Sequence, residues 1–149
     1  KLPPVKSVEV SRSWPHTIKI DITERTAIAV VPRGTQFAGM DESGVLFRDY
    51  LTKPAKLPLI ADSASADREA REEAAHVVGS LSPALWSRVE SVEVTSIDGI
   101  TLVMRNGQRV VWGRASDSEA KAEVLEILIK RPGVKVIDVS VAGRPTTRS

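Results

Sequence analysis

Cysteine is absent from the sequence, so disulfide bonds and thiolate metal ligands are excluded. Aromatic residues make up only 4% of the chain, and a core must therefore be built mainly from Val, Ile, Leu and Ala. No apolar run approaches the ~18 to 20 residues that a helix needs to cross a bilayer, and no signal peptide opens the sequence. The lack of cysteine is compatible with a cytoplasmic protein and with an exported one, so it does not indicate the cellular compartment.

Recognisable catalytic motifs are also missing. The sequence has neither a Gly-x-Ser-x-Gly nucleophile elbow nor a phosphate-binding loop. His16 and His76 have no second His or Cys at metal-ligand spacing, and both are interpreted as solvated surface residues. Asp41 and Glu42 are neighbours on an expected turn, where turn formation is a simpler role than paired acid–base catalysis. We therefore predict a protein that is not an enzyme and that uses no cofactor or metal.

Positive and negative charges are nearly balanced. The net charge is +2 with a pI of about 9.1, and Lys and Arg are interleaved with Asp and Glu rather than gathered in a basic run. This pattern does not predict nucleic-acid binding. The 149 residues are 42% hydrophobic and 27% charged, which is enough for one domain, or a domain and a fragment, with a packed core.

The first part of the chain alternates between apolar and polar residues. Val8 and Val10 alternate with polar neighbours, and the isoleucines of the segment 18–22 do the same. Trp14-Pro15 separates the two segments and favours a turn. The pattern predicts a β-hairpin with one face on a core and the other in water.

The rest of the chain predicts further strands and two helices. Expected strands cover 27–31, 36–40, 45–47, 57–60, 89–96, 100–105, 108–112 and 134–141. A polar loop at 62–66 precedes a helix over 67–81 with acidic first turns, and Ser82-Pro83 stops or restarts it. A second helix follows the capping-box spacing of residues 116–119 and ends at 131–133. Two turns are expected, a four-residue loop at 41–44 and a type I′ turn at Asn106-Gly107.

This order of elements indicates an α+β fold. Runs of hairpins interrupted by two helices predict a mostly antiparallel or mixed sheet with both helices on one face, preceded by the N-terminal hairpin. Trp14 and Trp86 lie beside proline-marked turns and are expected to pack at the edge of the core. For Trp112, packing and a role as an exposed binding anchor remain equally open.

The N-terminal hairpin resembles the end of the POTRA module of the bacterial division protein family FtsQ, called DivIB in some bacteria. The residues that carry this resemblance are Leu2-Pro3, Arg12, Trp14-Pro15, Thr17 and Glu24-Arg25. A complete POTRA module has an earlier strand and helix, so the resemblance implies a truncated module whose hairpin is exposed or frayed.

The remaining chain resembles the β domain of the same family. A first motif matches at Phe37, Asp41, Gly44, Val45 and Phe47, although the Asp follows the Phe by four residues rather than three. A second set matches at Ile100, Leu102, Gly107, Val110, Gly113, Lys121, Ile137, Asp138 and Val139, with one hairpin spacing off by a residue. The expected division is a POTRA-like part at 1–31, a β domain at 32–142 and a polar tail at 143–149.

The resemblance implies a non-enzymatic scaffold of the cell division machinery. Such a protein binds partners of the FtsB and FtsL type and helps control septal peptidoglycan synthesis. It is expected at the cell membrane of the septum, held by one upstream helix, with this part on the extracytoplasmic side. Two alternatives are a POTRA-bearing transport or assembly protein of the outer membrane and, with less support, a cell-wall enzyme.

The last expected strand is the predicted binding surface. A final strand often lies at a sheet edge, where its unpaired backbone groups can recruit another chain by strand addition. In the family this region is where FtsB docks; the simpler alternative is an ordinary edge strand blunted by Pro145 and the arginines. The predicted partner-binding residues are Trp112, Ile137, Asp138, Val139, Ser140, Val141, Ala142, Gly143, Arg144, Thr146 and Arg148. Glu24 and Arg25 are predicted either to fix the orientation of the two units or to form an ordinary exposed charge pair.

Overall fold

The structure is a computed structural model that describes residues 3–62 and 68–149, without the side chain of residue 62. The expectations for Leu2, for residues 63–66 of the polar loop predicted at 62–66, and for Asp67 lie outside these described residues, whereas residue 62 ends a strand and not a loop. The described chain forms two separate sheets, one of two strands and one of nine.

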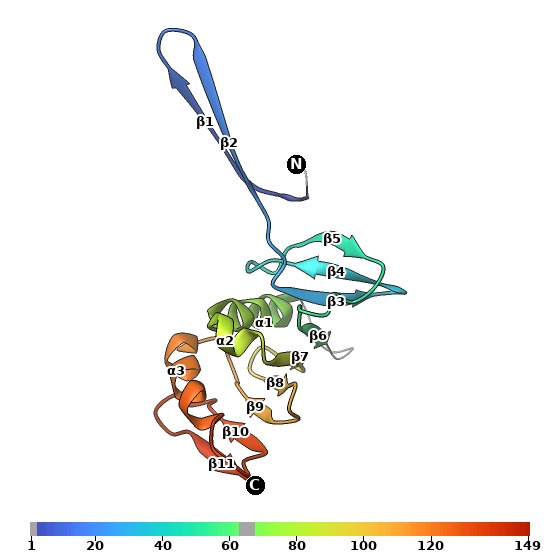
Figure 1. The fold of residues 1–149 in the computed structure, drawn as a ribbon, viewed down its shortest axis with the longest axis vertical. Helices are drawn as coiled ribbons and strands as arrows, with labels where there is room; N and C mark the ends of the chain where they lie inside the picture. Colours follow the sequence, from blue (N-terminus) through green and yellow to red (C-terminus); the bar gives the residue numbers. More distant parts are fainter. Residues whose placement is uncertain (1–2, 63–67) are drawn as a thin grey trace.

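The two-stranded sheet is a hairpin that projects from the rest of the molecule (Figure 1). β1 (Val5–Ser13) pairs antiparallel with β2 (Thr17–Glu24). Val10 lies opposite Ile20, so their side chains share one face, yet they are 68% and 58% exposed. The prediction that this face lies on a core is wrong, and the exposure implied by the POTRA resemblance is what the structure has. Trp14 is 87% exposed, so its predicted packing is wrong as well.

The larger sheet has the strand order β11-β10-β9-β8-β7-β6-β3-β4-β5. Its strands are β3 (Ala29–Arg33), β4 (Gln36–Met40), β5 (Leu46–Tyr50), β6 (Leu59–Asp62), β7 (Val89–Val94), β8 (Ile100–Met104), β9 (Arg109–Val111), β10 (Val136–Asp138) and β11 (Thr146–Arg148). Pairing is parallel at β3–β6, β6–β7 and β9–β10 and antiparallel at the other five contacts. The α+β class with a mostly antiparallel, mixed sheet is confirmed. The expected boundary after residue 31 falls inside β3.

The helices α1 (Arg68–Ser80), α2 (Pro83–Trp86) and α3 (Ser118–Leu128) lie on one face of this sheet (Figure 1). Their apolar sides and the inward side chains of the strands form one core, whose fully buried members include Ile60, Val77, Leu102, Leu125 and Ile137. The opposite face of β7–β9 carries half-buried or exposed residues, as expected for an antiparallel sheet with one solvated side.

The helix predicted over 67–81 is confirmed as α1, and the chain restarts at α2 as expected. Ser82 caps α2 by accepting a hydrogen bond from the backbone N–H of Leu85 at 3.3 Å. Trp86 packs against the core and donates from Nε1 to the carbonyl oxygen of Ile28 at 3.0 Å, which confirms its expected role.

The predicted capping box at the start of α3 is not formed. Asp117, the N-cap residue, has a left-handed backbone with φ 55° and makes no side-chain capping bond. The Ser118 hydroxyl instead donates to the carbonyl oxygen of Ala115 at 2.7 Å. Because α3 begins at Ser118, its N-cap is Asp117 rather than Ser116, and the residue three positions after it is Ala120, which has no side chain that could complete a capping box.

The turn between β8 and β9 also differs from the expected type I′ turn. Gly107 has φ 84°, but Asn106 does not have the positive φ that a type I′ turn requires at both positions. The N–H of Gly107 donates to the Met104 carbonyl at 2.9 Å, and that of Met104 donates to the Gln108 carbonyl at 2.9 Å. This is a three-residue loop in which a type I turn is followed by a left-handed glycine.

Candidate partner-binding surfaces

β10, which was expected to contain the sheet edge, is paired on both sides. It runs parallel to β9 with Ile137 opposite Val110, and antiparallel to β11 with Ile137 opposite Thr147. The prediction that the segment 134–141 is the edge strand is therefore wrong. The outer edge of the sheet at this end belongs to β11, which lies in the segment expected to be a polar tail.

A compact turn brings β11 back onto β10. Asp138 ends β10 by accepting hydrogen bonds on Oδ1 from the N–H of Ser140 at 3.0 Å and from its hydroxyl at 2.7 Å. The N–H of Arg144 then donates to the carbonyl oxygen of Val141 at 3.0 Å. Pro145 lies just before β11, where its missing N–H removes no donor from the ladder. The proline thus permits the reversal without interrupting the strand.

The predicted binding residues separate into buried and exposed groups. The side chains of Trp112, Ile137 and Val139 are 0% exposed, so they are not part of the accessible surface of the chain, and partner binding by these residues stays a prediction. Asp138 and Ala142 are half-buried. The exposed members are Ser140, Val141, Gly143, Arg144, Thr146 and Arg148. The accessible part of the predicted surface is therefore the turn after β10 together with β11.

Trp112 lies in the core behind this edge of the sheet. Its indole Nε1 donates to the Ser118 hydroxyl at 3.1 Å. Lys121 is buried beside it, and Nζ donates to the carbonyl oxygens of Trp112 at 3.2 Å and Arg114 at 2.8 Å. Burial lowers the pKa of Lys121, while the nearby charges of Asp117 and Glu73 act in the opposite direction. The motif lysine thus fixes the loop between β9 and α3 rather than contacting solvent.

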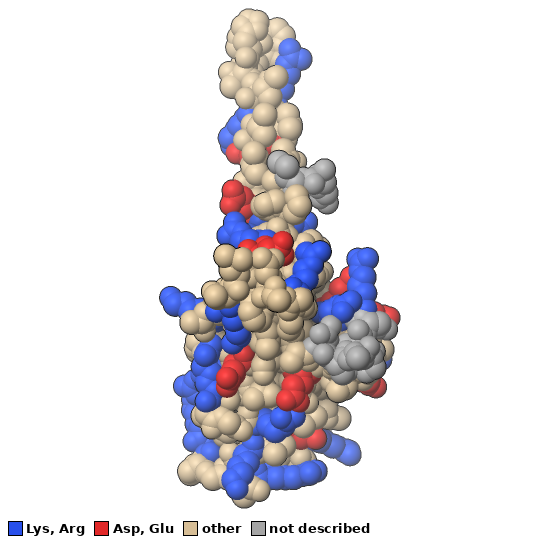
Figure 2. Space-filling model, turned by 90° about the vertical axis from the view of Figure 1, so that its right-hand side faces the viewer, with Lys and Arg blue, Asp and Glu red and all other residues tan. Residues whose placement is uncertain are grey.

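Positive charge gathers around the exposed edge. Lys135, Arg144 and Arg148 are exposed, and Figure 2 shows Lys and Arg side chains grouped at the end of the molecule where β10 and β11 lie. On the solvated face of the sheet, Arg109 Nη2 pairs with Glu93 Oε2 at 2.5 Å, and this hydrogen bond raises the pKa of Arg109. The edge therefore presents backbone groups flanked by basic side chains.

The junction between the two sheets is organised by Arg25. Its guanidinium forms a buried ion pair with Asp41, whose side chain is only 3% exposed. The N–H of Arg25 donates to the Pro4 carbonyl at 2.8 Å, which ties the end of β2 to the start of β1. Glu24 is exposed and opposite Val5 in the hairpin. Within the predicted pair, Arg25 is thus the residue that contacts the nine-stranded sheet.

Asp41 also holds the β4–β5 turn. Its Oδ1 accepts hydrogen bonds from the N–H groups of Ser43 at 3.0 Å and Val45 at 2.9 Å. A second ion pair, Lys6 Nζ to Glu42 Oε1 at 2.5 Å, lies nearby and is exposed. Sequence reasoning recognised the turn but missed the contact of Asp41 with Arg25, because these residues lie in separate predicted units. The one signal that could have indicated this contact is that Arg25 and Asp41 each belong to a motif of the same family.

Metal-binding clusters and membrane-spanning helices are absent from the described residues. Among residues 3–62 and 68–149, no group of three or more His, Cys, Asp or Glu side chains is placed to hold a metal ion. Across the same ranges, no helix has the length and apolarity that spanning a membrane requires. His16 and His76 are exposed, as expected for solvated surface residues.

Two family models match the chain. The model described as "Cell division protein FtsQ/DivIB, C-terminal" matches residues 29–140, and the model described as "POTRA domain, FtsQ-type" matches residues 1–25. The two matches meet at the junction between the two-stranded and nine-stranded sheets.

Curated relatives come from the same family, and a solved structure shares the fold. The chain is 36% identical to the cell division protein FtsQ of Streptomyces collinus over 161 residues, covering 99% of this chain and 61% of the relative. It is 34% identical to FtsQ of Mycolicibacterium smegmatis over 149 residues, covering 97% of this chain and 43% of the relative. The chain thus spans about three fifths of the length of the Streptomyces relative. The major extracytoplasmic domain of DivIB from Geobacillus stearothermophilus, in its trans isomer, shares the fold with a TM-score of 0.54 and 20% identity over 70% of this chain and 87% of that chain.

Proposed function

The chain belongs to the FtsQ/DivIB family of cell division proteins, and from this premise we propose that it is an extracytoplasmic scaffold of the division machinery. In this proposal it binds partners of the FtsB and FtsL type and catalyses no reaction. Its contribution to septal peptidoglycan synthesis is to hold these partners in place. A single upstream helix anchors the protein in the membrane at the septum.

The observation that carries the proposal is the free outer edge of β11. β10 has a neighbour on each side, whereas β11 is the outermost strand and all three of its residues are exposed. A strand from a partner can extend the sheet there, with backbone hydrogen bonds giving affinity. The proposed docking site is therefore the C-terminal part of the predicted one, residues 144–148 out of the segment 137–148.

The side chains around β11 favour an acidic partner strand. Arg144 and Arg148 flank the exposed edge, and Lys135 lies beside Arg148, whose carbonyl accepts a hydrogen bond from the Lys135 N–H at 2.9 Å. Opposite charges across a forming interface accelerate association and fix its register. The POTRA-bearing transport protein considered as an alternative loses support, because the POTRA model that matches is of the FtsQ type.

The proposed division of the chain follows the two sheets. The POTRA-like unit ends with β2 and the second unit begins with β3, so residues 25–28 form the connection. Arg25 and Asp41 fix the orientation of the two units across it.

Proline substitutions in β11 test the docking site. Successive N–H groups of a strand point to alternate edges, so either Thr146 or Thr147 directs its N–H toward the open side. We expect either Thr146→Pro or Thr147→Pro to weaken binding of an FtsB-type peptide by about 1 to 3 kcal/mol through an unpaired backbone group while leaving the melting temperature nearly unchanged. The other proline variant should disturb the β10–β11 pairing.

The matched controls are Thr146→Ala and Thr147→Ala, which retain the N–H groups. Binding is measured by titration calorimetry after circular dichroism has established that each variant is folded. Unaltered peptide affinity in both folded proline variants would place the docking surface elsewhere.

A further inference from the structure

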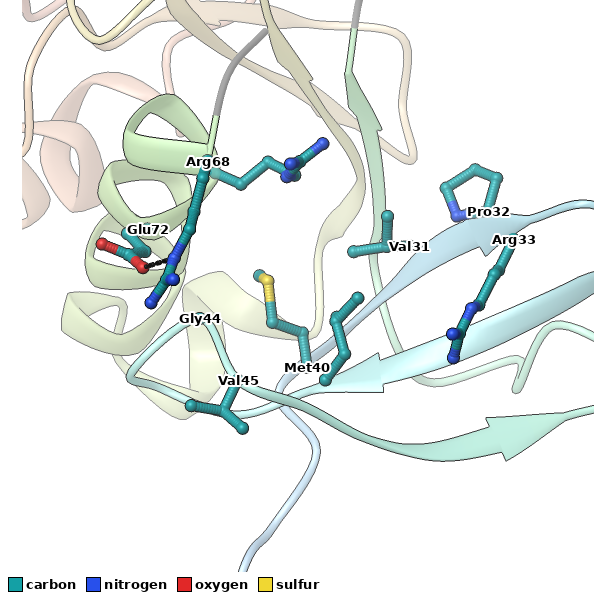
Figure 3. Close-up of a pocket in the computed structure, with 10 residues that line it drawn as sticks. Val31, Pro32, Arg33, Met40, Gly44, Val45, Arg68 and Glu72 are labelled. Carbon is teal, nitrogen blue, oxygen red and sulfur yellow. Dashed lines mark hydrogen bonds and ion pairs between the residues drawn. The ribbon is translucent and has the colours of Figure 1, made fainter. Parts of the chain in front are cut away.

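A groove lies at the opposite end of the nine-stranded sheet from β11. It has a volume of about 550 Å³ and separates the first turns of α1 from the helix-facing side of β3, β4 and β5. Figure 3 shows Met40 and Val31 on the sheet side of the groove and Arg68 and Glu72 on the helix side. Val45 and Leu46 are 38% and 43% exposed along it, so the groove offers an apolar surface that the described chain leaves open.

The wall formed by the β4–β5 turn is held in place by contacts on two sides. Gly44 has φ 75°, and a Cβ atom at this position would lie 2.9 Å from Cγ of Glu72. The turn thus rests directly on α1 at a contact that only glycine allows. Asp41 fixes the same turn by accepting the N–H of Val45 and by pairing with Arg25. The groove is therefore preformed, which reduces the entropy lost when a ligand binds.

The rim of the groove is basic. Arg33, Arg68 and Arg71 line it together with one acid, Glu72. Arg68 Nε pairs with Glu72 Oε1 at 2.6 Å, and Arg33 Nη1 pairs with Asp49 Oδ1 at 3.5 Å, but both arginine side chains are exposed, by 87% and 67%. Exposed ion pairs of this kind contribute little stability, so a bound acid can replace these carboxylates at small cost.

The groove continues along the edge of the sheet. A second hollow of about 160 Å³ shares Arg33 and Leu46 with the groove and extends past Phe47, Arg48 and Asp49. These last three residues belong to β5, the outermost strand at this end. An occupant that fills both hollows must be extended, because the track follows a strand.

We propose that this groove and the adjoining edge of β5 bind an extended segment of a second protein, one in which acidic residues alternate with aliphatic ones. The aliphatic side chains contact Val45 and Leu46, and the carboxylates pair with Arg33 and Arg68. Since β5 and β11 bound the same sheet at opposite ends, this site is separate from the docking site at β11. The protein would then hold two partners at once, one at each edge.

A peptide titration tests this site. The probe is a short peptide of alternating glutamate and leucine, added to the isotope-labelled 149-residue chain and followed by amide chemical shifts. We expect saturable shifts at Val45, Leu46 and the first turns of α1. The double variant Arg33→Glu, Arg68→Glu should weaken binding by at least about tenfold, equivalent to about 1.4 kcal/mol.

The matched control is Arg12→Glu with Lys19→Glu, which reverses two exposed charges in the β1–β2 hairpin, outside both proposed docking sites, and should leave peptide affinity unchanged. A lysine–leucine counterpart of the peptide should not bind. Equal binding of the two peptides, or shifts confined to β11, would overturn the proposal. Preferential binding of phosphatidylglycerol vesicles, lost in the Arg33→Glu, Arg68→Glu variant, would assign the groove to a membrane surface and also overturn it.

Discussion

The β1–β2 and β7–β8 hairpins have the same alternating pattern but lie in different environments. In β7–β8, Val92 faces Leu102 across the strands, and both are 0% exposed beneath the helices. In β1–β2, Val10 faces Ile20 in the same way, and both are more than half exposed. Alternation determines which side chains share a face, whereas a second layer of structure decides whether that face is buried. The two hairpins therefore differ in whether other elements bury their apolar face, and not in whether their strands form.

The largest expected effect is at the contact between the two regions. Replacing Asp41 with alanine leaves the buried charge of Arg25 without a partner and removes the acceptor for two N–H groups of the β4–β5 turn. We expect Asp41→Ala to lower the free energy of unfolding by about 3 to 5 kcal/mol. Urea denaturation followed by circular dichroism measures this change.

The neighbouring acid provides the control for Asp41. Glu42 pairs with Lys6, but the side chains are 58% and 44% exposed, so Glu42→Ala should cost less than about 1 kcal/mol. Similar costs for the two alanine variants would mean that the Arg25 contact does not hold the hairpin and the larger sheet together.

The second prediction compares the same substitution in both regions. Ile100 is 1% exposed in β8, and Ile20 is 58% exposed in β2. We expect Ile100→Ala to cost about 2 to 5 kcal/mol of unfolding free energy because it opens a cavity in the core. Ile20→Ala should change it by no more than about 0.5 kcal/mol. Urea denaturation of the two variants compares them directly, and a large loss for Ile20→Ala would show that the exposed face of the hairpin is covered in solution.

The smallest effect is expected at the β8–β9 turn, inside the covered region. Gly107 has φ 84° with no atom within 4 Å of an added Cβ, so Gly107→Val introduces backbone strain without a clash. We expect a loss of about 1 to 2 kcal/mol, seen as a lower melting temperature, with partner affinity per folded molecule unchanged. Gly143→Val is the control, because Gly143 has equal space and no left-handed φ. Equal melting temperatures for both variants would contradict the assigned turn.

Local elements were predictable because their signals lie within a few residues of one another. The spacing of Ala70, Ala74 and Val77 predicted α1 to within a residue or so at each end. The apolar alternation at 89–96 and 100–105 predicted β7 and β8, and the Asn106-Gly107 signal predicted the hairpin of β8 with β9. The capping box of α3 was predicted incorrectly, because the helix begins one residue later than the spacing of residues 116–119 indicates and has Asp117 as its N-cap.

The C-terminal edge of the sheet could not be predicted from local sequence patterns. β11 has three polar residues, Thr-Thr-Arg, too few for a period-2 pattern, so the sequence indicated an extended tail and placed the edge at β10. The reversal depends on the turn between Asp138 and Arg144 and on pairing with β10. The sequence did not decide whether Trp112 packs in the core or is an exposed binding anchor, since an indole at the end of a strand is compatible with either role.

The sequence by itself determined the two longer helices, the strands other than β11, the mixed α+β class and the family, because periodicity and motif order are properties of neighbouring residues. Only the tertiary structure decided which apolar faces are covered, which strand is outermost, and that Arg25 meets Asp41. Burial and pairing depend on residues far apart in the chain, and the same short pattern can be covered in one hairpin and exposed in another.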